Sequence, residues 1–219
     1  MDIKRRQELF LDAIETSLVM AKVSYARLYQ GLVQKSNPTE TNSLVDYPKV
    51  ILLDAWTFVD TINRLRILVS QMPGLKKNSR VTQFQKATES TEILRDFVQH
   101  VNAEIPKVEN TGWPIWGSIS WVYLSFDLDG KPKILIQSII PGRLAKVKGI
   151  PMVNPVGKSL EIPIDHISLS ATGVTLNLSD IHRLVVEFEK RFLVALGGED
   201  KIDTGRIGEA GIKRITLKD

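Results

Sequence analysis

The fold of this chain is decided by residues 48–72, which read PKVILLDAWTFVDTINRLRILVSQM. Apolar residues recur along this stretch at three- and four-residue steps and cover more than one side of a helix. Pro48 suits the first turn of such a helix, and Pro73-Gly74 ends the pattern. A helix this apolar is expected at the centre of a bundle or in an oligomer interface.

Two further helical segments flank the central one. Residues 4–34 and residues 80–105 each carry an apolar stripe at helical spacing. The polar stretch 35–46 separates the first segment from the central helix, and Pro106 follows the third segment. The pattern therefore predicts three long helices that form an N-terminal antiparallel bundle.

The second half of the chain changes from helical to strand periodicity. Residues 117–126 and 132–140 alternate or run apolar and are rich in β-branched and aromatic residues. Asp129-Gly130 lies between them and is typical of a hairpin turn. Further short strands are predicted at residues 142–153, 158–164, 166–170 and 173–178.

A last helix is predicted at residues 180–196, after which the sequence loses its pattern. Ser179 or Asp180 can cap this helix, and Gly197-Gly198 ends it. Residues 197–219 are rich in glycine and poor in large apolar side chains, which predicts a flexible tail.

These segments predict an α+β chain. The antiparallel helical bundle occupies residues 1–112, and residues 113–196 add a small, mostly antiparallel β-sheet and a C-terminal helix packed on the bundle. A length of 219 residues is enough to bury a sizeable core.

Composition narrows the classes of function. The net charge is +4, and the basic residues are not concentrated in one segment. Charge alone therefore does not indicate a nucleic-acid or membrane partner. The absence of cysteine excludes disulfides, thiolate metal sites and cysteine nucleophiles, and it fits a cytoplasmic protein. Neither a signal peptide nor an apolar run long enough to span a membrane is seen.

The residues that can carry chemistry gather in the third predicted helix, at Arg95-Asp96-Phe97-Val98-Gln99-His100. Arginine can bind a phosphate through two parallel hydrogen bonds, and histidine can transfer protons near neutral pH. Asp96 stands one helical turn before His100 and can orient its imidazole. Five helical positions turn the chain by roughly 140°, so Arg95 and His100 do not share one face.

A purely structural interpretation of these residues is also open. Glu92–Arg95 and Asp96–His100 have the spacing of helix-stabilising pairs, each worth about 0.2–0.5 kcal/mol. Asp60 and Arg64 in the central helix have the same spacing and can form an ordinary ion pair.

The same residues resemble the signature of the HEPN superfamily. That signature is an arginine, a polar residue and, after four to six intervening positions, a histidine on a late helix of a bundle; Arg95, Asp96 and His100 match it. The central helix is similar to that of HEPN-like bacterial proteins, in which an aspartate and an arginine one turn apart precede a proline-terminated helix. Asp60 and Arg64 occupy those two positions.

The resemblance implies a metal-independent endoribonuclease of toxin or defence type that acts at a dimer interface. Arg95 would bind the phosphate, His100 would transfer protons and Asp96 would orient His100. Asp60, Arg64 and Gln99 would support them. The implied partners are RNA, an antitoxin-like protein and a second copy of the chain. Other members lack activity, so the alternative is a non-catalytic interaction or nucleotide- and RNA-binding module.

Two other groups of residues have an ordinary structural explanation. Trp113, Trp116 and Trp121 can stack on bases, but aromatic residues at a helix-to-sheet junction more often pack. His166 and His182 have no metal-ligand spacing, and no nucleotide-binding or dinucleotide-binding motif occurs. No metal and no cofactor is expected.

Overall fold

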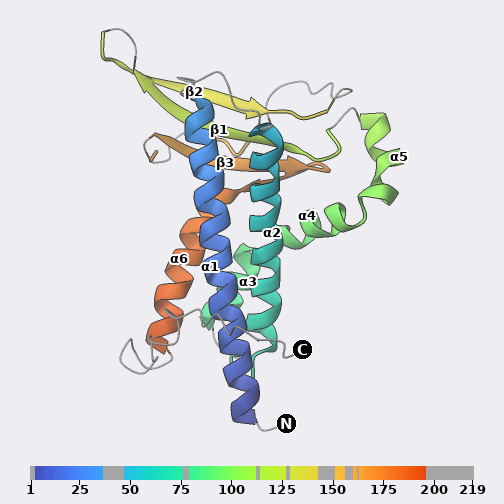
Figure 1. Ribbon diagram of the computed structural model, residues 1–219, viewed down its shortest axis with the longest axis vertical. Coiled ribbons are helices and arrows are strands. Elements are labelled where there is room, and N and C mark those ends of the chain that lie inside the picture. Colours follow the sequence, from blue (N-terminus) through green and yellow to red (C-terminus); the bar gives the residue numbers. More distant parts are fainter. Residues whose placement is uncertain are drawn as a thin grey trace, which may run out of the picture.

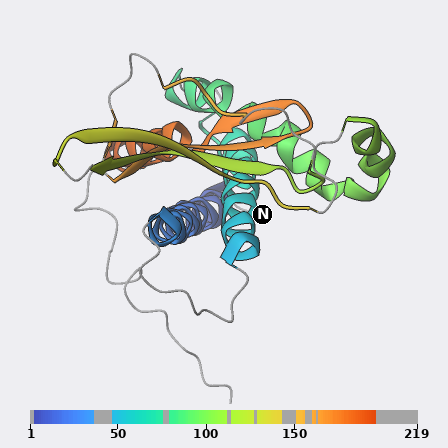
Figure 2. The same cartoon turned by 90° about the horizontal axis from the view of Figure 1, so that it is seen from above.

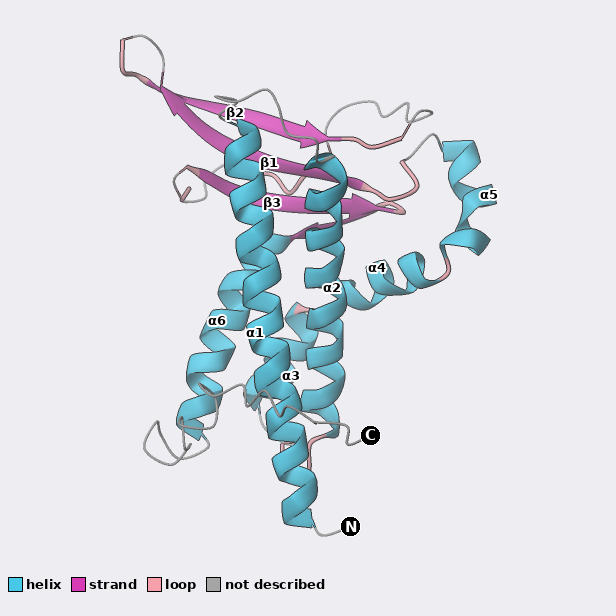
Figure 3. Cartoon of the chain, in the orientation of Figure 1, coloured by secondary structure: helices cyan, strands magenta, loops and turns pink. Residues whose placement is uncertain are grey.

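The computed structural model describes residues 3–36, 47–75, 79–111, 114–126, 129–142, 151–155, 160–161 and 163–195. These residues form an α+β fold, as the sequence predicted, with helices and a four-stranded antiparallel sheet (Figures 1 and 3). The helices are α1 (Ile3–Ser36), α2 (Tyr47–Gln71), α3 (Ser79–Ala87), α4 (Ser90–Gln99), α5 (Val101–Thr111) and α6 (Leu178–Ala195). The strands are β1 (Ser118–Phe126), β2 (Pro132–Ile139), β3 (Ile164–Ala171) and β4 (Val174–Asn177).

Helices α1 and α2 form the antiparallel pair on which the rest of the fold is built. Gln7, near the start of α1, donates a hydrogen bond of 3.2 Å to the carbonyl of Pro73, just after α2. At the other end of the pair, Gly31 of α1 lies against Ile51 of α2. The middle of α2 is largely buried, and one side of it carries a stripe of exposed and half-exposed residues. That stripe includes Leu53, Trp56, Thr57, Asp60, Arg64 and Ile67.

The prediction of a single helix at residues 80–105 is wrong, because three short helices, α3, α4 and α5, occupy this region. Between α3 and α4 the threonine hydroxyls bond to the backbone: Thr88 donates to the carbonyl of Phe84 and Thr91 to that of Thr88. Backbone bonds there tighten to three-residue steps, which ends the regular helix. His100 then separates α4 from α5, with non-helical φ and ψ of −113° and 25°. Helix α5 continues past Pro106, where the sequence predicted an end.

The sheet has the strand order β2-β1-β3-β4 with every neighbouring pair antiparallel. The predicted hairpin is confirmed, with Phe126 opposite Pro132 at its turn. Strands β3 and β4 correspond to the predictions at residues 166–170 and 173–178.

The strands predicted at residues 142–153 and 158–164 are not found in the described residues of those ranges, apart from Ile164 at the start of β3. Residues 143–150, 156–159 and 162 lie outside the described residues. Pro151 and Pro163 lie in these two ranges and disfavour strands there, because proline cannot donate a hydrogen bond to a neighbouring strand.

Helices α1 and α2 lie against one face of the sheet, and the strands run across their long axes (Figures 1 and 2). The opposite face carries small serine side chains, over which the segment 151–155 passes. Ser120 donates a hydrogen bond of 2.7 Å to the carbonyl of Pro151, and Ser170 donates one of 3.3 Å to the same carbonyl. Serine therefore lets this segment approach the sheet closely.

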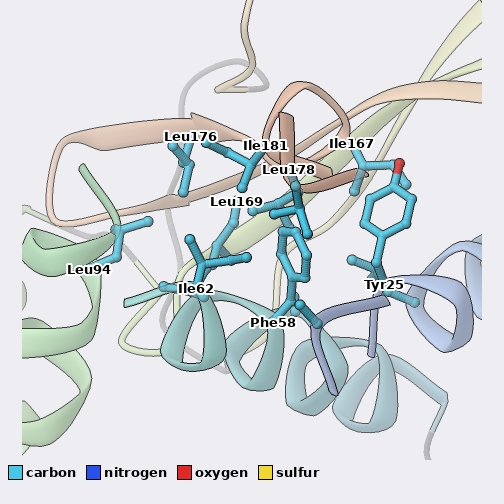
Figure 4. Packing of buried hydrophobic residues seen from close by; sticks show 14 of the residues in the cluster. Tyr25, Phe58, Ile62, Leu94, Ile167, Leu169, Leu176, Leu178 and Ile181 are labelled. Carbon is cyan, nitrogen blue, oxygen red and sulfur yellow. The ribbon is translucent and has the colours of Figure 1, made fainter. Parts of the chain in front are cut away.

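One continuous hydrophobic core joins the helices to the sheet. Phe58 and Ile62 of α2 face Leu169 of β3 and Leu178 of α6, with Leu94 of α4 at one side (Figure 4). Helix α6 lies beside α1, where Lys22 and Glu189 form an ion pair of 2.6 Å. The two predicted parts, residues 1–112 and 113–196, thus share this core. The predicted tail at residues 197–219 lies outside the described residues.

Replacing Gly117 by alanine is expected to lower the free energy of unfolding by about 1–3 kcal/mol, measured by urea unfolding. Gly117 has a φ of +74°, and an added Cβ would lie 2.5 Å from the carbonyl oxygen of Ser170. Gly130 also has a φ of +74° but has no atom within 4 Å of such a Cβ. Gly130→Ala therefore reports backbone strain alone, and equal losses in both variants would refute the steric contribution.

Candidate functional site

The candidate site is built around a carboxylate that binds two arginines. Asp60 of α2 places one oxygen 2.7 Å from Nε of Arg64 and the other 3.3 Å from Nε of Arg95 on α4. Helix α4 buries Leu94 and Phe97, and this fixes the neighbouring Arg95 toward α2. The predicted pair Asp60–Arg64 therefore forms, and Arg95 joins it from another helix.

These three charged residues line an open groove of about 320 Å³ between α1, α2 and α4. The predicted supporting residue Gln99 also lines it. The remaining residues of the groove are apolar or carry hydroxyls. They are Met20, Trp56, Thr57, Val59, Thr61 and Val98. We call this site the arginine groove.

The hydroxyls and the indole N–H of the arginine groove are already bonded to the backbone. The hydroxyl of Thr57 donates to the carbonyl of Leu53, and that of Thr61 donates to the carbonyl of Thr57, both at 2.7 Å. The indole N–H of Trp56 donates to the carbonyl of Trp116 at 3.1 Å. Arg64 and Arg95 are thus the groups of this groove best suited to bind an anion.

Two carboxylates, one in the groove and one beside it, balance the charges of the two arginines. Asp60 pairs with both arginines, and Asp96 places a carboxylate oxygen 3.6 Å from Nη1 of Arg95. The side chain of Arg64 is 64% exposed and that of Arg95 is 28% exposed. Ion pairs this open to water contribute about 0–1 kcal/mol each, so an incoming phosphate can replace a carboxylate partner at small cost.

His100 lies outside the arginine groove. Its backbone links α4 to α5: its N–H donates to the carbonyl of Asp96, and its carbonyl accepts from Ala103 and Glu104. Its imidazole is exposed, and within the described residues it forms no hydrogen bond or ion pair with Arg95 or Asp96. One copy of the chain therefore brings together Arg95, Asp60, Arg64 and Gln99, but not His100.

The tryptophans contribute to packing. Trp121 is buried, and its indole N–H donates to the hydroxyl of Ser36 at 2.9 Å. Trp116 is about half exposed, and its carbonyl accepts the bond from Trp56. Trp113 lies outside the described residues.

A second polar cluster joins β3, α6 and α1, and it was not predicted from the sequence. Arg183 of α6 binds three carboxylates: Asp165 at 2.5 Å, Asp180 at 2.7 Å and Glu161 at 3.1 Å. Asp165 also accepts hydrogen bonds from the backbone N–H groups of Glu161 and His166. Burial opposes its ionisation, but these bonds and Arg183 outweigh burial and lower the pKa of Asp165.

Aromatic and strained residues surround this cluster. His182 stacks on Tyr25 at a centroid distance of 3.9 Å, and burial lowers the pKa of His182. The hydroxyl of Tyr25 donates to Ser179, and burial raises the pKa of Tyr25 to about 12. His166 is buried at a β-bulge with a φ of +52°. Tyr25 is separated from the other residues of this cluster by more than 130 positions, so no local pattern could reveal their contact.

Other classes of site were sought in the described ranges. No group of three or more histidine, aspartate or glutamate side chains there is arranged to hold a metal ion. None of the helices in these ranges combines the length and apolarity needed to cross a membrane. Comparisons with protein-family models, curated proteins and solved structures found no match to this chain.

Proposed function

We propose that this chain is a metal-independent endoribonuclease of toxin or defence type, whose arginine groove binds the RNA backbone. The convergence of Arg95 and Arg64 on a single carboxylate in an open groove carries this proposal. Two guanidinium groups held a few ångströms apart suit a phosphate, which offers several oxygens to bidentate donors. Trp56 and Val98 give the same groove an apolar wall against which a base can rest.

The proposed reaction is an internal transfer of phosphate. The 2′-hydroxyl of RNA attacks the neighbouring phosphorus, a new O2′–P bond forms, and the bond to the 5′-oxygen breaks. A base takes the proton of the 2′-hydroxyl, and an acid protonates the departing 5′-oxygen. Arg95 stabilises the negative charge that grows on the phosphate in the transition state.

His100 is the group proposed to transfer protons, and this role requires two copies of the chain. Because the imidazole of His100 lies outside the groove of its own copy, we infer that it acts on RNA bound by the partner's groove. Exposed apolar residues next to the groove support such a face-to-face dimer: Val23 follows Met20 by one turn, and Leu53 precedes Thr57 by one turn. An antitoxin-like protein would cover the same apolar face.

A non-catalytic RNA- or nucleotide-binding module is the second candidate. The observation that favours it is the separation of His100 from Arg95 within one copy, together with the neutral charge balance of the groove. Such a module would bind RNA through the same arginines without cleaving it.

One assay separates the two functions. Labelled structured and single-stranded RNAs are incubated with the protein in EDTA, beside the Arg95→Ala and His100→Ala variants. Cleavage by the unaltered protein that both variants lose supports the ribonuclease. RNA binding without cleavage, lost in Arg95→Ala and kept in His100→Ala, supports the binding module and refutes the ribonuclease.

Replacing Asp60 by asparagine is expected to tighten RNA binding about 3- to 10-fold, because the two arginines lose their competing carboxylate. Asp60 lies in the groove and contacts both guanidinium groups, so it occupies the place expected for a phosphate. Fluorescence anisotropy of a labelled oligonucleotide at one fixed salt concentration measures this change.

Asp96→Asn is the matched control, because it removes the same charge. Asp96 lies 3.6 Å from Arg95 but does not line the groove. Its side chain is 58% exposed and does not occupy the place of the phosphate, so its effect on affinity should be within about 2-fold. Weaker binding by Asp60→Asn would mean that Asp60 positions the arginines for RNA, and it would contradict competition.

A further inference from the structure

The two edges of the sheet differ in how they are protected. Strand β4 forms one edge, has four residues, and packs against α4. Strand β2 forms the other edge and has eight residues. Alternate residues of an edge strand direct their N–H and C=O groups away from the sheet, where another strand can bind them.

Strand β2 lacks most of the features that keep an edge free of partners. Pro132 and Lys133 stand at its start, and the rest of the strand, residues 134–139, carries no charge. Natural edge strands are usually short, charged, bulged or covered. An eight-residue edge strand with six consecutive uncharged residues is therefore expected to have a partner strand.

A group of exposed apolar side chains adjoins this edge. Ile134 is 58% exposed, Ile136 is 47% exposed, and Phe126, which follows Leu124 on the neighbouring strand, is 60% exposed. Ile140, just past the strand, is 36% exposed. All four lie at alternate positions that share the face of the sheet opposite the helices. We call them the β2 patch.

We propose that β2 pairs in antiparallel orientation with β2 of a second copy, so that two four-stranded sheets become one eight-stranded sheet. A twofold axis between the two β2 strands brings the same residues of both copies together. Two identical strands related by such an axis, perpendicular to the sheet, are antiparallel. The β2 patches of the two copies then adjoin each other across the new ladder. This inference does not depend on the arginine groove.

Charge permits a second copy of the chain as the partner, and area sets how tightly it would bind. A twofold axis near Ile136 places the two Lys133 side chains at opposite ends of the ladder, so like charges do not meet. Each copy supplies one strand edge and four apolar side chains, which is less than the roughly 800 Å² per partner of a standard interface. We therefore expect a weak dimer with a dissociation constant on the order of micromolar.

Sedimentation velocity over a range of protein concentrations tests the dimer. The test is made in a Leu53→Lys background, in which the apolar face beside the arginine groove is blocked. There, Ile136→Lys should shift the remaining monomer–dimer equilibrium to monomer and raise the dissociation constant at least about 10-fold, because two ammonium groups would face each other. Leu9→Lys is the control, since Leu9 is 56% exposed in the first turns of α1, and the N-terminal end of α1 lies far from the sheet (Figure 1). Circular dichroism verifies that both variants fold.

Disulfide cross-linking is a second test. Because the chain contains no cysteine, only an introduced cysteine can form a disulfide between copies. Single cysteines at positions 134, 136 and 138 are placed along one row of β2, and oxidation should link copies most strongly at the position nearest the twofold axis. Leu9→Cys measures random cross-linking.

The proposal is overturned if the protein stays monomeric, or if no position of β2 cross-links more than Leu9→Cys. A dimer that Leu53→Lys abolishes and Ile136→Lys leaves intact would also overturn it. That result would place self-association at the arginine groove and leave the proposed ribonuclease standing, whereas a protein that stays monomeric would contradict both proposals.

Discussion

Replacing Arg95 by alanine is expected to lower the rate of RNA cleavage in EDTA by about 100- to 1,000-fold. Arg95 is half as exposed as Arg64, and its guanidinium is held by Asp60 from one side and Asp96 from the other. A cation fixed in this way stabilises transition-state charge without further reorganisation. Gel analysis of a labelled RNA under single-turnover conditions measures the rate of the chemical step.

Three further variants make this result specific. Arg95→Lys keeps the charge but loses the planar pair of donors, so it should restore only part of the rate. Arg64→Ala should cost less than Arg95→Ala, since Arg64 is the more exposed of the two. Arg191→Ala removes an equivalent arginine from an exposed pair with Glu187 on α6 and should change nothing. Equal rates for Arg95→Ala and Arg191→Ala would refute the proposed role.

The sequence predicted the elements whose pattern is local. The apolar stripes gave the positions of α1, α2 and α6, and Asp129-Gly130 marked the turn between β1 and β2. The breaks around Thr88 and at His100 were missed, because the apolar stripe continues through both points. Around Thr88 the helix is interrupted by bonds between threonine hydroxyls and backbone carbonyls, and at His100 by a non-helical backbone; neither has an apolar signature.

The candidate site was predictable only within single helices. The spacing of Asp60 and Arg64 on α2 was sufficient to predict their ion pair, which forms at 2.7 Å. The contact between Asp60 and Arg95 joins residues 35 positions apart and depends on how α4 packs against α2. The helical rotation between Arg95 and His100 indicated different faces, and the non-helical backbone of His100 separates the two side chains further.

Replacing Asp165 by alanine is expected to lower the free energy of unfolding by about 3–5 kcal/mol, because it leaves buried partners without their acceptor. The Asp165 carboxylate is buried and accepts from Arg183 at 2.5 Å and from the backbone N–H groups of Glu161 at 3.0 Å and His166 at 2.6 Å. Urea unfolding at pH 7 measures the loss. Glu161→Ala is the control: it removes another partner of Arg183, but one that is 67% exposed, so its cost should stay within about 1 kcal/mol.

The loss of unfolding free energy caused by Asp165→Ala should become smaller at acidic pH. The pKa of Asp165 is lower in the folded chain than the ordinary value of about 3.9 in the unfolded chain. The folded state therefore holds the ionised form more strongly, and this contribution is complete above the unfolded pKa. This contribution is lost as the pH falls through the pKa of Asp165 in the folded chain. The difference in free energy of unfolding between the unaltered protein and Asp165→Ala should therefore be constant from pH 7 to about 5 and become smaller below about pH 4. A difference that widened on acidification would mean that the hydrogen bonds to Asp165 favour its protonated form, and that the ion pair with Arg183 does not stabilise the junction of β3 and α6.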